Sequence, residues 1–255
     1  MIYAAIGALA VGLVLGLLGA GGGIITSPIL ILLLHHPEKV ANTESLAIVA
    51  AISAVGALRN YKAGHLEPRT VLVFSAAGVL GTIAGAMVSR SVSGPLEVLI
   101  LACVMLASGI LMLRPQPSGP ALKPTPTNSL IMLAAFAGVG LLTALVGVGG
   151  GFLIVPTLVL LGGRSMRAAV GTSLGVITIN AASGFLMRLQ QNFNMDWRVL
   201  HGPVIAMFIA VGIAGLLAGS HLGSKIPQRT LKKIFAVFLL VLSCYLAWRQ
   251  LPRLF

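Results

Sequence analysis

Charged side chains are scarce in this sequence. Asp, Glu, Lys and Arg together make up 9% of the 255 residues, whereas they make up about a quarter of an ordinary soluble domain. Hydrophobic residues make up 57%, and the mean hydropathy is +1.02. This composition excludes a typical soluble domain and indicates an integral membrane protein.

Motifs of catalysis and metal binding are also missing. The sequence has no G-x-S-x-G, H-E-x-x-H, Walker lysine or paired carboxylates, so we expect no enzyme. Its two cysteines, Cys103 and Cys244, form no C-x-x-C motif, and its five histidines lack the spacing of metal ligands. We therefore expect no metal and no cofactor.

Acidic residues are few, and the balance of charge is strongly basic. Seventeen Lys and Arg against five Asp and Glu give a net charge of +12. In a soluble chain this would suggest nucleic-acid binding, but nearly all of the basic residues lie in short connections between apolar segments, where they contact lipid headgroups and set topology. As partners we expect membrane lipids and a small anionic substrate, no nucleic acid, and a homodimer as an open alternative to a monomer.

Apolar segments of helical length run along the whole chain. Several approach the roughly 20 residues that cross a hydrocarbon core, and none shows the ten-residue alternation of a membrane barrel. The sequence therefore predicts an all-α polytopic membrane protein.

The chain contains an internal repeat. Gly19–Leu32 (GAGGGIITSPILIL) aligns at an offset of 128 with Gly147–Leu160 (GVGGGFLIVPTLVL), which places Pro28 on Pro156. Five prolines fall within residues 114–128, a composition typical of a linker. We predict a first transmembrane repeat at 1–113, a linker at 114–128 and a second repeat at 129–255.

The glycine runs divide the chain into helical pieces that are too short to cross the membrane alone. Ala4–Gly19 would measure roughly 24 Å and Ile24–Leu34 roughly 16 Å as helices, against a hydrocarbon core of about 30 Å. Either the two pieces form one kinked crossing, or they form a hairpin that turns inside the membrane. A hairpin plus three crossings per half collects eleven of the seventeen basic residues on one side, whereas four crossings per half split them nine to eight. The basic-inside rule thus favours hairpins, inverted repeats and both termini outside the cytoplasm.

The same glycines are the first candidate site. Unwound backbone in a membrane must face protein or a water-filled cavity, and free amides at a helix start attract anions. The alternative is that the glycines only allow close helix packing. We expect anion contacts from Gly21, Gly22, Gly23, Gly149, Gly150 and Gly151.

Polar residues at the predicted starts of the following helices are the second candidate. The segments ANTESL at 41–46 and AVGTSL at 169–174 carry hydroxyls and an amide that bind an anion without adding charge, or that merely cap their helices. Together with the glycines they predict a neutral polar pocket lined by Thr26, Asn42, Thr43, Ser45, Thr172 and Ser173.

Glu44 is the one carboxylate near this predicted pocket. A glutamate at a helix start usually stabilises the helix dipole, but inside a membrane it can carry a coupling proton. Its repeat equivalent is Thr172, so a coupling role would belong to one half alone.

The duplicated G-x-G-G-G-x₄-P units, each followed by a T-x-S-L or G-T-S-L segment, resemble the sulfite exporter TauE/SafE family over essentially the whole chain. The resemblance implies a multi-pass protein of the bacterial inner membrane that moves small anions, often sulfur-containing ones such as sulfite or organosulfonates. We expect a secondary transporter with Glu44 as the candidate for proton coupling. The alternatives are a passive anion channel and a membrane scaffold that transports nothing.

Overall fold

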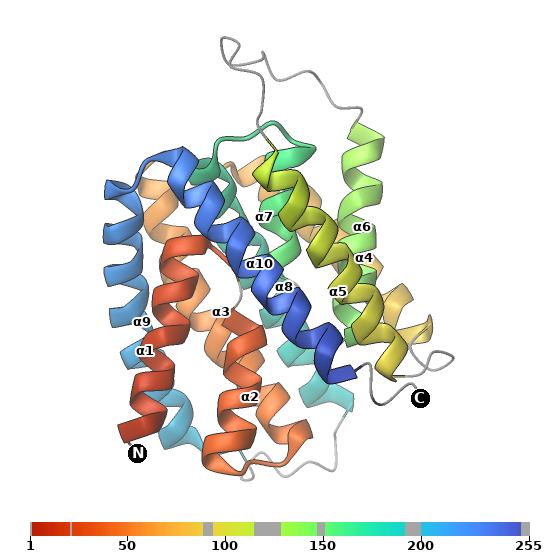
Figure 1. Ribbon diagram of the computed structural model, residues 1–255. Helices are drawn as coiled ribbons and strands as arrows, with labels where there is room; N and C mark the ends of the chain where they lie inside the picture. The colour runs from red at the N-terminus through yellow and green to blue at the C-terminus, as the bar shows by residue number, and fades with distance from the viewer. Residues whose placement is uncertain are drawn as a thin grey trace.

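The computed structural model describes residues 2–20, 22–88, 94–114, 129–146, 151–191 and 200–250. Within these ranges the chain forms ten helices and no strand, which confirms the predicted all-α class (Figure 1). The helices are α1 (Ile2–Leu18), α2 (Gly22–Leu34), α3 (Glu38–Lys62), α4 (Pro68–Val88), α5 (Gly94–Leu113), α6 (Ser129–Val146), α7 (Gly151–Leu160), α8 (Met166–Gln191), α9 (Gly202–Lys225) and α10 (Gln228–Gln250).

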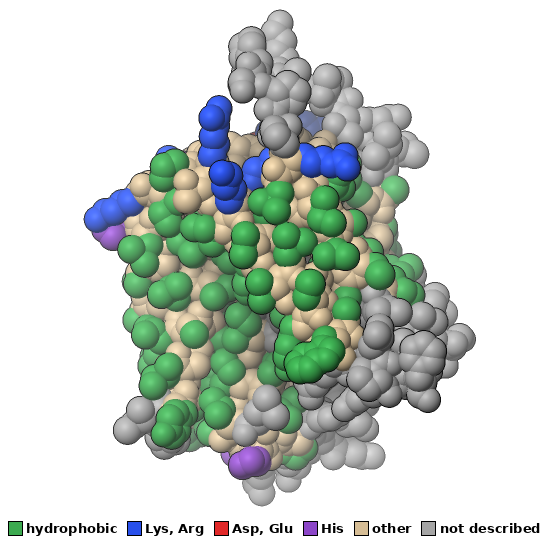
Figure 2. Space-filling view, in the orientation of Figure 1, with side chains coloured by type: hydrophobic (Ala, Val, Ile, Leu, Met, Phe, Trp, Pro, Cys, Tyr) green, Lys and Arg blue, Asp and Glu red, His purple; other side chains and the backbone are tan. Residues whose placement is uncertain are grey.

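The described helices have the lengths and surfaces of a membrane protein. Val40–Lys62, Met166–Met187 and Gly202–Lys225 are each long and apolar enough to cross a membrane. Hydrophobic side chains cover the flank of the bundle (Figure 2), and several large ones are fully turned outward, such as Leu72 at 65% and Trp248 at 76% exposed. An apolar surface of this extent is suited to lipid, so the fold is that of a polytopic membrane protein.

The first glycine run breaks a helix, as the sequence predicts. In Figure 1, α1 rises from the lower end to about halfway along the bundle, and α2 returns to the lower end. Gly19 closes α1 with a φ of 65°, a conformation that costs glycine nothing, and its N–H donates to Leu15 O at 2.8 Å. Pro28 lies inside α2, as Pro156 lies inside α7.

The basic residues gather at one end of the bundle. The loops from α3 to α4, α7 to α8 and α9 to α10 lie at the upper end in Figure 1, and Figure 2 shows Lys and Arg side chains clustered there. An ion pair between Arg164 and Glu67 joins two of these loops. The N-terminal end of α1 and the C-terminal end of α10 both lie at the opposite, lower end of the bundle.

Helices from the two predicted halves pack closely against one another. α1 packs on α9, α6 on α4, and α3 on α8 at the centre of the bundle. At two of these crossings backbone meets backbone: a Cβ at Gly12 would overlap the carbonyl oxygen of Gly212, and a Cβ at Gly140 would overlap that of Gly78. Small residues permit this approach, as is common between membrane helices.

The helix starts predicted at residues 41–46 and 169–174 are wrong. α3 begins at Glu38, directly after Pro37, because proline fixes its own φ and has no N–H to place in a helix interior. α8 begins at Met166, where Ser165 Oγ accepts from Ala168 N at 3.3 Å. The polar residues of both segments therefore lie inside their helices.

Candidate functional site

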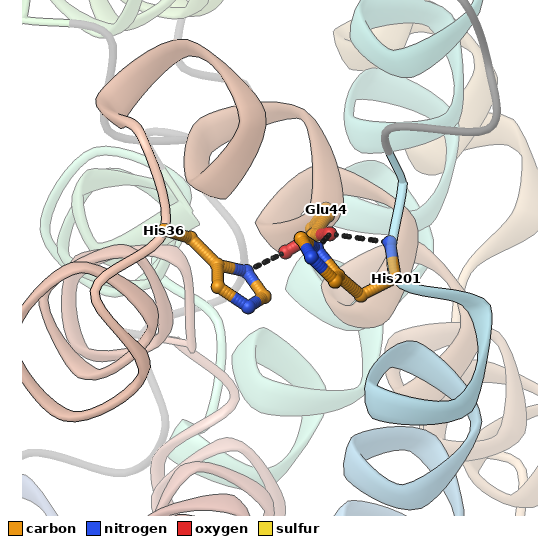
Figure 3. Close-up of side chains that lie close together, drawn as sticks. All are labelled: His36, Glu44 and His201. Carbon is orange, nitrogen blue, oxygen red and sulfur yellow. Dashed lines mark hydrogen bonds and ion pairs between the residues drawn. The ribbon is translucent and has the colours of Figure 1, made fainter.

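Glu44 lies completely buried in a cluster with two histidines. Its Oε2 lies 2.6 Å from His36 Nδ1, and its Oε1 lies 3.1 Å from His201 Nδ1 and accepts from His201 N at 2.9 Å (Figure 3). The two imidazole rings stack with centroids 4.0 Å apart. We call His36, Glu44 and His201 the carboxylate–histidine cluster.

Three separate elements position this cluster. His36 sits in the short loop between α2 and α3, where its N–H donates to Leu30 O at 3.2 Å, and Glu44 follows in the second turn of α3. His201 is the residue immediately before α9. The cluster therefore ties the first predicted half of the chain to the second, at the end of the bundle opposite the basic loops.

The cluster encloses one carboxyl group inside the bundle. A buried carboxylate is costly unless it is paired or hydrogen-bonded, and within the described residues the ion partners of Glu44 are the two histidines alone. Among the helices packed on α3, α1 and α2 contain no Asp, Glu, Lys or Arg, α8 contains Arg167 and Arg188, and α9 contains Lys225 and directly follows His201. His201 is half exposed, at 48% of its side chain, and so connects the buried carboxylate to the outside.

Such a cluster can bind and release a proton. Its donor atoms lie within 4.8 Å of one another, a set that also has the chemistry of a divalent-metal site. Both Nδ1 atoms, however, point at the carboxylate and are engaged with it. The arrangement therefore brings two imidazole nitrogens to one carboxylate, a geometry that fits a proton site or a divalent-cation site.

Sequence reasoning singled out Glu44 and missed both histidines, because their spacing along the chain shows no motif. The parallel that relates His201 to the repeat comes from the structure. The backbone N of Glu67, directly before α4, donates to Thr172 Oγ1 at 3.4 Å, just as the backbone N of His201, directly before α9, donates to Glu44 Oε1.

Ser173, one of the predicted pocket residues, contacts the glycine turn of the other half. Its Oγ lies 2.7 Å from Gly19 O and 2.9 Å from Val170 O, and it is fully buried. A Cβ on Gly19 would lie 2.8 Å from this oxygen. The turn between α1 and α2 is thus held against α8 at the centre of the bundle.

The other predicted site residues are distributed as follows. Thr26 is buried and its hydroxyl donates to Gly22 O at 2.6 Å, within its own helix. Thr43, Ser45 and Thr172 are buried, and Asn42 is half-buried. Gly22 and Gly23 belong to the first turn of α2, and Gly151 begins α7. Gly21, Gly149 and Gly150 lie outside the described residues.

Replacing Ser173 by Ala is expected to loosen the α1–α2 turn. The change leaves Gly19 O without its side-chain donor, at a cost of about 1–2 kcal/mol, or a fall in Tm of about 2–8 °C. Thermal melting of the purified protein measures it. Thr178→Val is the matched control, because the Thr178 hydroxyl donates only to Leu174 O of its own helix; equal falls in both variants would contradict this account of Ser173.

The fold and the buried cluster define a polytopic helical membrane protein with polar groups held inside its bundle. The family model for the sulfite exporter TauE/SafE matches residues 4–246. The chain belongs to this family, as its glycine motifs suggested.

Curated relatives agree with this assignment. A probable membrane transporter protein of Xylella fastidiosa (strain 9a5c) is 29% identical, covering 94% of this chain and 92% of the relative. The probable membrane transporter protein YdhB of Bacillus subtilis (strain 168) is 28% identical, covering 89% and 91%. A probable membrane transporter protein of Haemophilus influenzae is 29% identical, covering 93% of this chain and 94% of the relative. No solved structure matches the chain significantly.

Proposed function

We propose that this protein is a secondary transporter that moves a small, sulfur-containing anion such as sulfite or an organosulfonate across the inner membrane together with a proton. The observation that carries the proposal is the buried carboxylate–histidine cluster in a chain of a transporter family. Intramembrane carboxylates and histidines of this kind form the proton sites of pumps and transporters.

Two inverted repeats are the architecture that we propose for the chain. The equivalent pairs α1 on α9 and α6 on α4 support it, since Gly12 and Gly140, which meet Gly212 and Gly78, are themselves related by the offset of 128. The opposite directions of the two broken helix pairs in Figure 1 support it as well. Substrate sites of such transporters lie where the repeats meet.

The centre of the bundle offers polar groups for the passage of an anion. Ser173 and the Gly19 turn meet there. Ser53 Oγ in α3 and Asn180 Oδ1 in α8 are also buried, without a hydrogen-bond partner among the described residues. Buried polar atoms that lack protein partners are candidates for contact with water or substrate.

The distribution of basic residues supports one orientation. Loops rich in Lys and Arg remain in the cytoplasm, so the upper end in Figure 2 would face the cytoplasm. The carboxylate–histidine cluster and both chain termini would then face the periplasm.

Replacing Gly22 by Val is expected to reduce anion uptake at least tenfold while the protein still inserts. A Cβ at Gly22 lies 2.6 Å from Leu15 Cδ1, so the larger valine side chain requires the buried Leu15 side chain to move or α2 to shift from α1 beside the helix break. Uptake of sulfite, thiosulfate and organosulfonates into proteoliposomes measures the effect. Gly138→Val is the control, because nothing lies within 4 Å of a Cβ there.

The same assay separates the proposal from its rivals. A transporter gives saturable uptake that responds to a pH gradient. Linear uptake indifferent to pH would identify a passive channel instead, and the lack of uptake of any of these anions would favour a scaffold.

A further inference from the structure

The carboxylate–histidine cluster has the composition of a transition-metal site. His36, Glu44 and His201 offer two imidazole nitrogens and one carboxylate oxygen, and these ligand atoms lie within 4.8 Å of one another. Two histidines and one glutamate also hold the zinc ion of several enzymes, in which a water takes the fourth position. The expectation of no metal rested on the spacing of residues along the chain. That spacing hides this set, because His36 and His201 lie 8 and 157 positions from Glu44.

The three side chains are already arranged around a common point. The two imidazole rings stack, and each turns its Nδ1 toward the carboxylate of Glu44, at 2.6 Å for His36 and 3.1 Å for His201 (Figure 3). Ligand atoms of a tetrahedral zinc ion lie about 3.3 Å apart, given bonds of about 2.0–2.2 Å. The rings therefore have to withdraw by less than about 1 Å to admit an ion.

One carboxylate oxygen is held by the backbone, which leaves the other for the ion. Glu44 Oε1 accepts from the backbone N of His201 at 2.9 Å, whereas Oε2 faces His36. Hydrogen bonds to the outer side of a ligand fix its orientation and are a regular part of metal sites. The backbone of His201 supplies such a bond here.

The chemistry of the cluster selects the kind of ion. An ionised carboxylate inside a protein needs a positive partner, and within the described part of the chain no lysine or arginine pairs with Glu44. Imidazole ligands suit zinc, nickel and copper, whereas magnesium and calcium take six or more ligands that are mostly oxygens. The cluster therefore fits a divalent ion of the zinc class.

His201 connects the cluster to the outside. Glu44 is completely buried and His36 almost so, whereas the side chain of His201 is half exposed, at the end of the bundle opposite the basic loops. An ion that first binds the His201 ring from outside reaches the carboxylate as the ring turns inward.

The ligands belong to elements from both predicted halves of the chain. His36 lies in the loop between α2 and α3, Glu44 lies in α3, and His201 directly precedes α9, which packs on α3. Because metal binding adds its free energy to the structure that holds the ligands together, a bound ion would tie the start of α9 to α3. Any movement of one half relative to the other at this end would then be blocked.

We propose that His36, Glu44 and His201 form a binding site for one divalent ion of the zinc class, and that the bound ion inhibits the transporter. The two imidazoles and Glu44 Oε2 ligate the ion, and water completes its coordination. Inhibition follows because the ion fastens the two halves to each other. The inhibitory part of this inference rests on the proposed function, whereas the metal site itself does not.

Zinc binding measured by calorimetry tests the site directly. The protein carries no histidine tag, and Cys103→Ala and Cys244→Ala form the parent background, because both cysteines are exposed and thiolates bind zinc. We expect the parent to bind one zinc ion per chain and no magnesium. His201→Ala should bind zinc at least about tenfold more weakly. Equal affinity of the parent and His201→Ala, or the absence of zinc binding by the parent, would overturn the site.

His221→Ala is the matched control for this measurement. His221 is an exposed histidine in α9, and its replacement should leave the zinc affinity of the parent unchanged. A loss of affinity in His221→Ala as large as in His201→Ala would mean that zinc binds surface histidines and not the cluster.

Thermal melting gives a second readout that also shows whether a variant is folded. An ion that binds only the folded protein raises its Tm, by about 5–10 °C for a chain of this size when zinc is a hundredfold above its Kd. His201→Ala should melt cooperatively in EDTA, and the same zinc concentration should raise its Tm by at most about half as much. An equal rise in both proteins would contradict the site.

The metal site and the transport function fail in different ways. Saturating zinc should nearly stop pH-driven anion uptake by the parent in proteoliposomes, EDTA should restore it, and magnesium should have no effect. Uptake unchanged by bound zinc would refute the inhibition. If the parent takes up anions but binds no zinc, the metal site is wrong and the transport function stands. If it binds zinc as expected but transports none of the tested anions, the metal site stands and the function is wrong.

Discussion

Replacement of Glu44 by Gln uncouples anion transport from the pH gradient. Gln keeps the shape and hydrogen-bonding capacity of a protonated carboxyl group but never carries a charge or releases a proton. If one proton moves with each monovalent anion, a gradient of one pH unit supports about tenfold accumulation in the less acidic compartment. We expect this accumulation in wild-type proteoliposomes and none in Glu44→Gln. The variant still carries the anion down the anion's own concentration gradient.

The matched control for this variant is Glu67→Gln. Glu67 is the carboxylate partner of Arg164 in the loops at the other end of the bundle, where its side chain is 38% exposed. Its replacement should leave the tenfold accumulation intact. Accumulation by Glu44→Gln at the wild-type level would show that the carboxylate–histidine cluster carries no coupling proton.

Replacement of Gly140 by Ala is expected to destabilise the bundle severely. The new methyl group would overlap the carbonyl oxygen of Gly78, which is backbone and cannot rotate away. α6 and α4 must then separate along their whole contact, at a cost of at least about 3 kcal/mol. A fall in Tm of about 6–12 °C follows for a chain of this size, measured by thermal melting in detergent.

Gly138 supplies the control within the same helix. A Cβ at Gly138 meets nothing within 4 Å, so Gly138→Ala should keep the wild-type Tm. Gly12→Ala should behave like Gly140→Ala, because Gly12 meets Gly212 in the same way. Wild-type stability of both Gly12→Ala and Gly140→Ala would contradict the close helix crossings described here.

The membrane class and a helix break in the first glycine run could be predicted because each depends on local properties of the chain. The length of an apolar segment alone indicates whether it can form a membrane-spanning helix. Consecutive glycines weaken a helix wherever they occur. The break was expected at residues 21–23, whereas Gly22 and Gly23 lie in the first turn of α2 and the positive φ belongs to Gly19. The starts of α3 and α8 were misplaced because Ser, Thr and Asn were taken as caps. Pro37 and Ser165 set these starts instead, one turn or more earlier.

The candidate site was only partly predictable for a different reason. Glu44 stood out as a carboxylate in an apolar chain, but its partners depend on how the two halves pack. His201 reaches Glu44 only because α9 crosses to α1 and α3.

Sulfite uptake into proteoliposomes under an imposed pH gradient tests the central claim most directly. Saturable uptake is expected, in which the monovalent hydrogensulfite ion, carried with one proton, accumulates about tenfold per pH unit on the less acidic side. Uptake that is linear in sulfite concentration and identical with and without the gradient would contradict it.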